Sequence, residues 1–117
     1  MSTSTLYHNP RCSKSREALA LLTTNQINPT VVLYLEQTPS AEQLAELLAR
    51  LGFTDARQLM RKAEAEYTVL GLDKAELSQA ELIAALVTHP KLIERPIFCH
   101  NGKAVIGRPP EKVLEIL

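Results

Sequence analysis

The chain has 117 residues, 45% of them hydrophobic and 22% charged, so it can bury the core of one domain and is not disordered. Lys and Arg together number 13, as do Asp and Glu, and the resulting net charge of zero argues against a general nucleic-acid or anionic-membrane binder. The two cysteines, Cys12 and Cys99, are too few for a disulfide framework or a thiolate zinc site, and no apolar run could span a bilayer. We therefore expect free thiols in a reducing cytoplasm.

The first part of the chain predicts a strand, a helix and a second strand. Residues 4–7 mostly favour β-structure, and a polar loop over 8–11 leads to a helix that begins near Cys12 or Ser13. Residues 30–35 have the β-branched and apolar pattern of a strand buried on both faces. A strand–helix–strand unit of this kind is right-handed, so its two strands should be parallel.

The middle of the chain predicts helices. Residues 40–43 and 78–81 each match a capping box, in which a serine and a residue three positions later satisfy the first free amides of a helix. The first helix should end at Gly52 and the second near Thr88, before a proline. A shorter helix over about 55–60 fits between them.

The last part predicts a hairpin and a final helix. Residues 97–100 and 103–106 are candidate strands joined by Asn101-Gly102, the strongest short hairpin signal. The element order indicates an α/β fold: a single domain over 1–117 with a thioredoxin-like mixed sheet (β-α-β, then β-β-α) and a helical insert at about 40–90. This architecture suggests thiol chemistry only by analogy, so the function must be argued from individual residues.

Cys12 is the most informative candidate for chemistry. It lies where a strand ends and a helix begins, and backbone amides and the helix dipole place positive charge near such a sulfur. Arg11, Lys14 and Arg16 are close in sequence, which also favours the reactive thiolate. The alternative is a small residue buried at a packed helix start.

The other cysteine and the histidines give weaker signals. Position 15 is Ser15, so the helix does not open with a Cys-x-x-Cys dithiol, and Cys99 lies in an apolar strand as a core residue would. The histidines form no metal-ligand pattern with the cysteines. His8 lies four residues before the first cysteine and can interact with its thiolate, whereas His89 and His100 are interpreted as surface or cap residues.

Three arginines lie near breaks in the predicted structure: Arg61 ends the short helix, Arg95 precedes Pro96, and Arg108 follows the fourth strand. A guanidinium suits the planar, multidentate binding of oxyanions, although each arginine alone is more often a solvated surface charge. In the expected fold, the start of the third strand and the end of the fourth can border the Cys12 loop. Pro96 stands where thioredoxin-like folds place a cis-proline, the alternative being an ordinary trans proline that opens a strand.

These features resemble the Asn-Pro-x-Cys-x-x-Ser-Arg signature of the glutaredoxin-coupled arsenate reductases, which is matched by residues 8–16, His-Asn-Pro-Arg-Cys-Ser-Lys-Ser-Arg. The similarity covers essentially the whole chain, in the segments 33–36, 59–62, 70–72, 89–97 and 107–110. The resemblance implies a cytoplasmic enzyme of arsenical resistance that reduces arsenate to arsenite, with glutathione as co-substrate, a glutaredoxin as partner and no bound cofactor or metal.

The resemblance also implies roles for six residues: a nucleophile, Cys12; two residues that support its thiolate, His8 and Ser15; and three that hold the oxyanion, Arg61, Arg95 and Arg108. Two other functions remain open from the sequence. One is a general glutathione-dependent thiol oxidoreductase, and the other is a redox-linked regulator that binds the transcription machinery. Such regulators generally resemble a Cys-x-x-Cys form, which Ser15 does not match.

Overall fold

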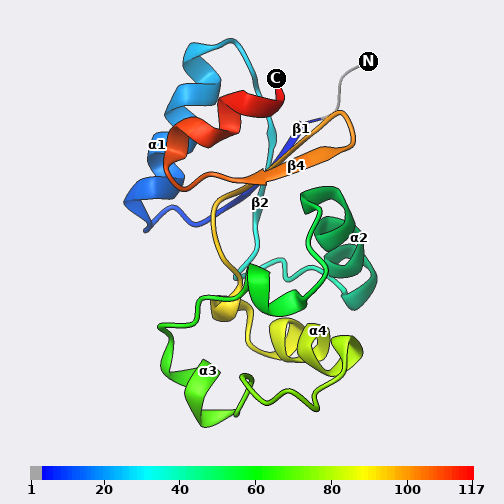
Figure 1. The fold of residues 1–117 in the computed structure, drawn as a ribbon. Coiled ribbons are helices and arrows are strands. Elements are labelled where there is room, and N and C mark those ends of the chain that lie inside the picture. Colours follow the sequence, from blue (N-terminus) through cyan, green and yellow to red (C-terminus); the bar gives the residue numbers. More distant parts are fainter. Residues whose placement is uncertain (1–3) are drawn as a thin grey trace. The chain divides into compact units, whose positions relative to one another are not determined.

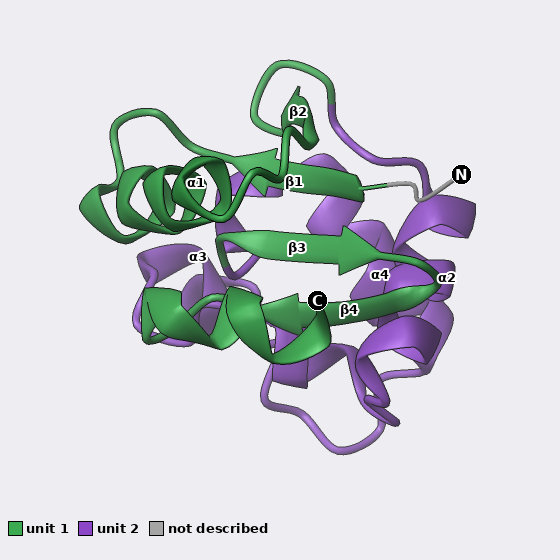
Figure 2. Ribbon diagram, turned by 90° about the horizontal axis from the view of Figure 1, so that it is seen from above, with its two compact units in different colours: residues 1–37, 95–117 green, residues 38–94 purple. Residues whose placement is uncertain are grey.

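The computed structural model describes residues 4–117 and divides the chain into two compact units. Unit 1 comprises residues 1–37 and 95–117, and unit 2 comprises residues 38–94 (Figure 2). Unit 2 is therefore an insertion in the sequence between the two parts of unit 1. Within the described residues, no helix is both long enough and apolar enough to cross a bilayer.

Unit 1 contains a four-stranded mixed sheet in the order β2-β1-β3-β4 (Figure 1). The central strand β1 (Ser4–His8) pairs in parallel with β2 (Thr30–Leu33) and antiparallel with β3 (Ile97–His100). The strand β4 (Lys103–Ile106) pairs antiparallel with β3. This is the thioredoxin-like mixed sheet that the order of elements predicts.

Two helices lie side by side on one face of this sheet, α1 (Ser13–Thr24) and the 3-10 helix η3 (Pro110–Ile116) (Figure 1). Side chains alternate between the two faces of a strand, so residues that pair across β1 and β3 share a face. The core between sheet and helices consists of five fully buried side chains: Leu6, Ala18, Leu22, Phe98 and Val113. The final helix that the sequence predicts is thus present, but as the tighter 3-10 form.

The strand β2 differs from the prediction for residues 30–35. It ends at Leu33, and both Thr30 and Val31 are exposed, with 39% of the Val31 residue surface accessible. The reason is its place at the edge of the sheet, where it has β1 as its only neighbouring strand. The apolar, β-branched run reflects strand propensity and not burial on both faces, so that expectation was wrong.

The predicted hairpin is confirmed. Asn101 and Gly102 both have positive φ values, 50° and 84°, as a two-residue turn of type I′ requires. Asparagine and glycine are the residues that accept this backbone conformation most readily. The turn therefore sets the register in which Ile97 lies opposite Ile106.

The interpretation of His100 as a surface or cap residue is wrong. Its side chain is buried, stacks on the ring of Phe98 with 5.7 Å between ring centroids, and bonds through Nδ1 to Ser4 Oγ at 2.7 Å. His100 follows Phe98 by two residues and so shares the strand face that packs on the helices. His89, by contrast, does cap the C-terminus of a helix of unit 2.

Unit 2 consists of short helices: α2 (Ala41–Leu51), η1 (Ala56–Leu59), α3 (Ala65–Val69), α4 (Gln79–Thr88) and η2 (Pro90–Leu92). Both predicted capping boxes are present, at Ser40 and Ser78, and Gly52 ends α2 with a φ of 75°. The helix α3 was not predicted from the sequence. It has five residues and no buried side chain, so it has no apolar stripe that would indicate a helix.

Candidate active site

The strand register brings three points of the chain to one end of the sheet. In β1, Tyr7 lies opposite Ile97 of β3, which in turn lies opposite Ile106 of β4. Because both pairings are antiparallel, the end of β1, the start of β3 and the end of β4 lie together. The end of β1 leads into the Cys12 loop, Arg95 lies just before β3, and Arg108 lies just after β4.

Cys12 occupies the N-cap position of α1 and is partly exposed. Its N–H donates to the carbonyl of Asn9 at 3.0 Å, which closes the preceding loop into a turn. Its own carbonyl accepts the first helical hydrogen bond, from the N–H of Arg16 at 3.0 Å. The thiol therefore stands at the helix end where amides lack intrahelical partners and negative charge is favoured.

Opposing influences act on the thiol, and their net effect lowers the pKa of Cys12. Partial burial is the largest single influence and raises the pKa of Cys12. The amide of Ser15, the positive charge of Arg95, the amide of Lys14 and the positive charge of Arg108 lower it, in that order of size. Both amides belong to the first turn of α1, so the helix N-terminus and the two arginines together favour the thiolate.

Beneath the Cys12 loop, His8 and Ser15 form a buried pair with 2.7 Å between Nδ1 and Oγ. The Ser15 hydroxyl also accepts the N–H of Asn9 at 3.0 Å. Burial, with a smaller contribution from the charge of Arg16, lowers the pKa of His8, so the ring is neutral at pH 7. In the Nε2–H tautomer, Nδ1 accepts the proton of the Ser15 hydroxyl. The pair thereby ties the end of β1 to the first turn of α1.

Arg95 and Arg108, both in unit 1, are held beside each other. Nη1 of Arg108 donates to the carbonyl of Arg95 at 3.3 Å. The Arg95–Pro96 peptide bond is cis, as the sequence analysis expects, and Arg108–Pro109 is also cis, for which the sequence analysis made no prediction. Both guanidinium groups act on the Cys12 thiol, which shows that they share its surroundings.

Arg61 belongs to unit 2, where its contacts are local. Its N–H donates to the carbonyl of Leu92 at 2.7 Å, and its Nη1 forms an ion pair with Glu64 Oε1 at 2.7 Å. Of the six residues singled out by the sequence, unit 1 thus brings five into one region and Arg61 lies in the other unit.

Asn9 and Gly107 both shape the site, although no role was predicted for either residue. Asn9 Oδ1 accepts the N–H of Arg11 at 3.0 Å, a turn that an Asn-Pro pair signals. A Cβ on Gly107 would lie 2.9 Å from Pro96 Cγ and 3.0 Å from Val113 Cγ1, so only glycine fits there without displacement. The feature of the sequence that could have indicated Gly107 is a small residue directly before an arginine at the end of a strand.

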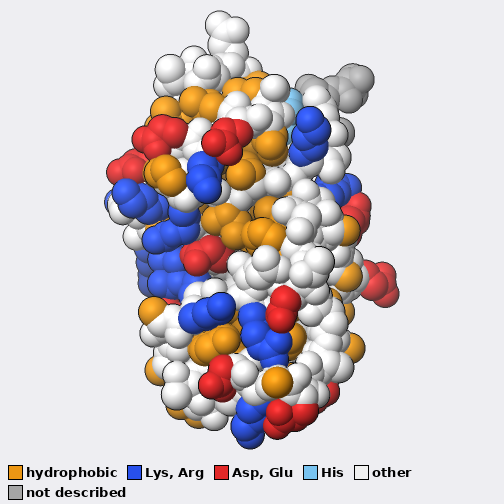
Figure 3. Space-filling model, viewed as in Figure 1, with side chains coloured by type: hydrophobic (Ala, Val, Ile, Leu, Met, Phe, Trp, Pro, Cys, Tyr) orange, Lys and Arg blue, Asp and Glu red, His pale blue; other side chains and the backbone are white. Residues whose placement is uncertain are grey.

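Positive charge dominates the surface around the start of α1. Figure 3 shows Lys and Arg side chains gathered on the side of unit 1 where α1 begins. Arg11, Lys14, Arg16 and Arg108 are all exposed residues, and Arg16 Nη1 donates to the carbonyl of Pro10 at 2.8 Å. Over residues 4–117, no three His, Cys, Asp or Glu side chains are grouped as a metal site would need. This positive charge around the start of α1 suits a thiolate that reacts with an anionic substrate.

The chain is similar to known proteins over nearly its whole length. The model of the ArsC family matches residues 7–116. An uncharacterized protein of Escherichia coli K12, YfgD, is 57% identical over 96% of this chain and 94% of its own length. An arsenate reductase of Haemophilus influenzae Rd is 53% identical over 96% of this chain and 97% of its own length. The solved structure of an arsenate reductase from Vibrio cholerae, 53% identical, superposes with a TM-score of 0.96 and covers 98% of each chain.

Proposed function

The chain belongs to the ArsC family, and on that premise we propose that it is an arsenate reductase that uses Cys12 as its nucleophile. The observation that carries the proposal is the thiol at the N-terminus of α1, whose pKa is lowered under the influence of Arg95 and Arg108. A thiol with these neighbours is ionised more readily than a free cysteine and faces fixed positive charge.

Positive charge is what this reaction requires. Arsenate is a tetrahedral oxyanion, so its approach to a thiolate is repulsive unless cations are already in place. The guanidinium groups of Arg95 and Arg108 and the free amides at the start of α1 offset that repulsion without reorganising. We propose that they hold the arsenate oxygens while the sulfur of Cys12 attacks arsenic. The resemblance adds Arg61 as a third oxyanion ligand.

The first step forms a Cys12–arsenic bond and breaks one arsenic–oxygen bond. The oxygen leaves as water after taking up protons, and arsenic remains As(V), as in other covalent catalysis by thiols. The neutral His8, through its bond to the Ser15 hydroxyl, holds the loop in the conformation that presents the thiol. His8 and Ser15 are therefore proposed as positioning residues.

The second step needs an external thiol, and we propose glutathione. Its sulfur displaces arsenic from Cys12: the two sulfurs each give up one electron and form a mixed disulfide, and arsenic gains two electrons and leaves as arsenite. A glutaredoxin then transfers the glutathionyl group to a second glutathione and restores the Cys12 thiol. This cycle fits a reducing compartment such as the cytoplasm, where thiols are kept free.

An internal disulfide is not available to replace glutathione. Cys99 is buried in β3 opposite Thr5, whereas Cys12 follows the far end of β1 beyond His8. His8 lies three positions beyond Thr5 along the strand, about 10 Å at the usual rise per residue. A disulfide needs Cα atoms within about 7 Å.

The test is arsenite production by the purified protein, with glutathione and glutaredoxin omitted in turn. We expect turnover to require both, Cys12→Ser to abolish it, and Cys99→Ser to keep most of it. Sustained turnover with thioredoxin alone, or a folded but inactive Cys99→Ser variant, would show that an internal disulfide carries the cycle. Reduction of a glutathione mixed disulfide without any arsenate turnover would instead favour a general thiol oxidoreductase.

A further inference from the structure

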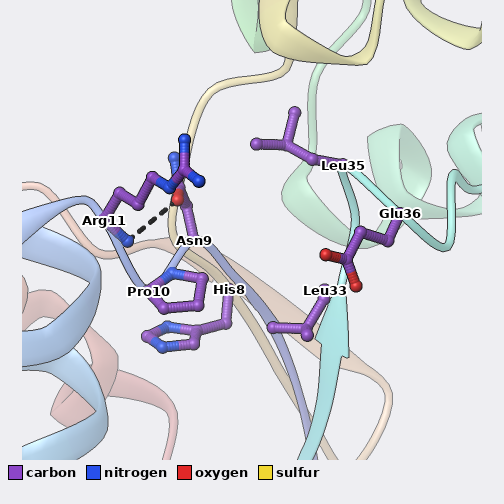
Figure 4. A pocket seen from close by; sticks show the side chains of 7 residues that line it. All are labelled: His8, Asn9, Pro10, Arg11, Leu33, Leu35 and Glu36. Carbon is purple, nitrogen blue, oxygen red and sulfur yellow. Dashed lines mark hydrogen bonds between the residues drawn. The ribbon is translucent and has the colours of Figure 1, made fainter.

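A pocket of about 290 Å³ adjoins the Cys12 loop within unit 1. Its walls come from two segments, the loop that precedes Cys12 and the chain at the end of β2 (Figure 4). They supply seven residues: His8, Asn9, Pro10 and Arg11 from the loop, and Leu33, Leu35 and Glu36 from the second segment. The volume lies near the lower limit for small-molecule pockets, roughly 300 Å³, so it suits one residue of a small peptide.

The pocket carries one positive and one negative side chain on opposite walls. Figure 4 shows the carboxylate of Glu36 directed toward the loop, Arg11 on the loop side, and Leu33 and Leu35 on the same segment as Glu36. Across the described residues 4–117, neither the Arg11 guanidinium nor the Glu36 carboxylate takes part in a hydrogen bond or an ion pair. Both charges are therefore available to a ligand.

We propose that this pocket binds the γ-glutamyl end of glutathione, with Arg11 on its α-carboxylate and Glu36 on its α-ammonium group. This inference rests on the proposed function, which needs glutathione. Only the γ-glutamyl end of that peptide carries both charges on one carbon. Its methylene groups can lie along Leu33 and Leu35. Arg11 lines the pocket and directly precedes Cys12 in the chain, so a glutathione bound here would place its thiol beside the Cys12 loop.

Arsenate is a poorer match for this pocket than the γ-glutamyl group. An oxyanion would gain from Arg11 but would meet the negative charge of Glu36 without a cation of its own to offer. A zwitterion pairs with both side chains, and the guanidinium can donate two parallel hydrogen bonds to its carboxylate. The pocket would thus select the reductant while the arginines beside the thiol select the oxyanion.

The test measures formation of the mixed disulfide on Cys12 in a Cys99→Ser background, by intact-protein mass spectrometry and without arsenate. The Cys12 thiolate attacks glutathione disulfide, forms one new sulfur–sulfur bond and releases glutathione as thiolate. A parallel reaction uses the disulfide of cysteinylglycine, which lacks the γ-glutamyl group. The ratio of the two rates is compared between variants, so the intrinsic difference between the reagents cancels.

We expect Arg11→Ala and Glu36→Gln each to lower the rate with glutathione disulfide about tenfold and to change the cysteinylglycine rate less than twofold. Arg11→Lys should restore part of the preference, because an ammonium keeps the charge and loses the planar fork. The matched controls are Arg50→Ala and Glu46→Gln, an exposed ion pair on α2, which should leave the ratio unchanged. Iodoacetamide alkylation of each variant checks that the Cys12 thiolate itself is unaltered.

An unchanged ratio, or an equal loss with both disulfides, would overturn the assignment of this pocket. Because no arsenate is present, a protein that proves inactive toward arsenate can still show the γ-glutamyl preference, so the two proposals fail separately. If the protein reduces arsenate, Arg11→Ala should also raise KM for glutathione and leave KM for arsenate unchanged.

Discussion

Cys12 and His8 owe their chemistry to their immediate surroundings. The sulfur is partly buried, which alone would suppress ionisation, but two guanidinium groups and the amides at the start of α1 outweigh that penalty. His8 shows the opposite case, because burial removes its charge and leaves a neutral ring bonded to Ser15. The surroundings thus favour the thiolate of Cys12 and the neutral ring of His8, two residues only four positions apart.

The first prediction concerns ionisation of Cys12. The alkylation rate with iodoacetamide, measured against pH in a Cys99→Ser background, should show a midpoint below the free-cysteine value of about 8.5. Arg95→Ala and Arg108→Ala should each move that midpoint upward, because each removes a charge that lowers the pKa of Cys12. A midpoint at or above about 8.5 in the parent protein would contradict the electrostatic account of the site.

The second prediction concerns the pH dependence of stability. The lowered pKa of His8 means that the unfolded chain binds a proton near pH 6.5, where folded His8 does not. The unfolded state therefore holds more protons as the pH falls, so the stabilisation is complete above about pH 6.5 and declines below it. Urea titrations at pH 7.5 and pH 5.5 should show a larger loss of unfolding free energy for the parent than for His8→Gln. Equal losses would show that His8 titrates normally.

At the scale of elements, the end of β4 is joined to two neighbours through Gly107. Its N–H donates to the carbonyl of Pro96 at 2.9 Å, and its α-carbon approaches both the Pro96 ring and Val113 of η3. Pro96 and Val113 are buried, so neither can move without repacking. This close contact fixes the position of the next residue, Arg108.

The third prediction is that Gly107→Ala disturbs both packing and the site. The added methyl group overpacks this contact, which should lower the unfolding free energy by roughly 1–3 kcal/mol. It should also raise KM for arsenate, because Arg108 is displaced with the strand end. Gly52→Ala serves as the control: its φ of 75° makes alanine costly by about 1 kcal/mol, but the added Cβ meets no atom within 4 Å. A Gly107→Ala protein with parental stability and KM would exclude the tight contact.

At the scale of the whole molecule, the chain is organised as two compact units, and the sequence resemblance draws on both. Unit 1 contains the thiol, the buried His8–Ser15 pair, Arg95 and Arg108, whereas Arg61 lies in unit 2 and pairs with Glu64. That Arg61 also binds the oxyanion stays a prediction, carried by the resemblance.

The fourth prediction tests whether Arg61 binds the oxyanion, by measuring KM for arsenate. Arg61→Ala should raise KM for arsenate about tenfold or more, the size expected for loss of one charge-assisted contact to an anion. Arg61→Lys should restore only part of the loss. Glu64→Gln removes the ion-pair partner and keeps the arginine, so it should leave KM for arsenate near the parental value. Equal effects of Arg61→Ala and Glu64→Gln would mean that the ion pair supports folding and that Arg61 does not bind arsenate.

The sequence by itself determined the features that depend on neighbours along the chain. Both capping boxes, the Asn101-Gly102 turn and the start of a helix directly after Cys12 each involve groups only a few residues apart, so their patterns are visible as short motifs. The α/β order also follows from such local elements. For the same reason, the sequence could single out Cys12 as the candidate nucleophile before its surroundings were known.

The tertiary structure decided what depends on pairing between distant segments. The edge position of β2, the burial of His100 and the approach of Arg95 and Arg108 to Cys12 all follow from the order and register of strands. Side-chain exposure and electrostatic contact depend on distance in space, and residues some 80 positions apart acquire a distance only when the sheet forms. A local pattern therefore points to Cys12 as the candidate nucleophile, whereas the charges of Arg95 and Arg108 that lower its pKa are brought to it by the fold.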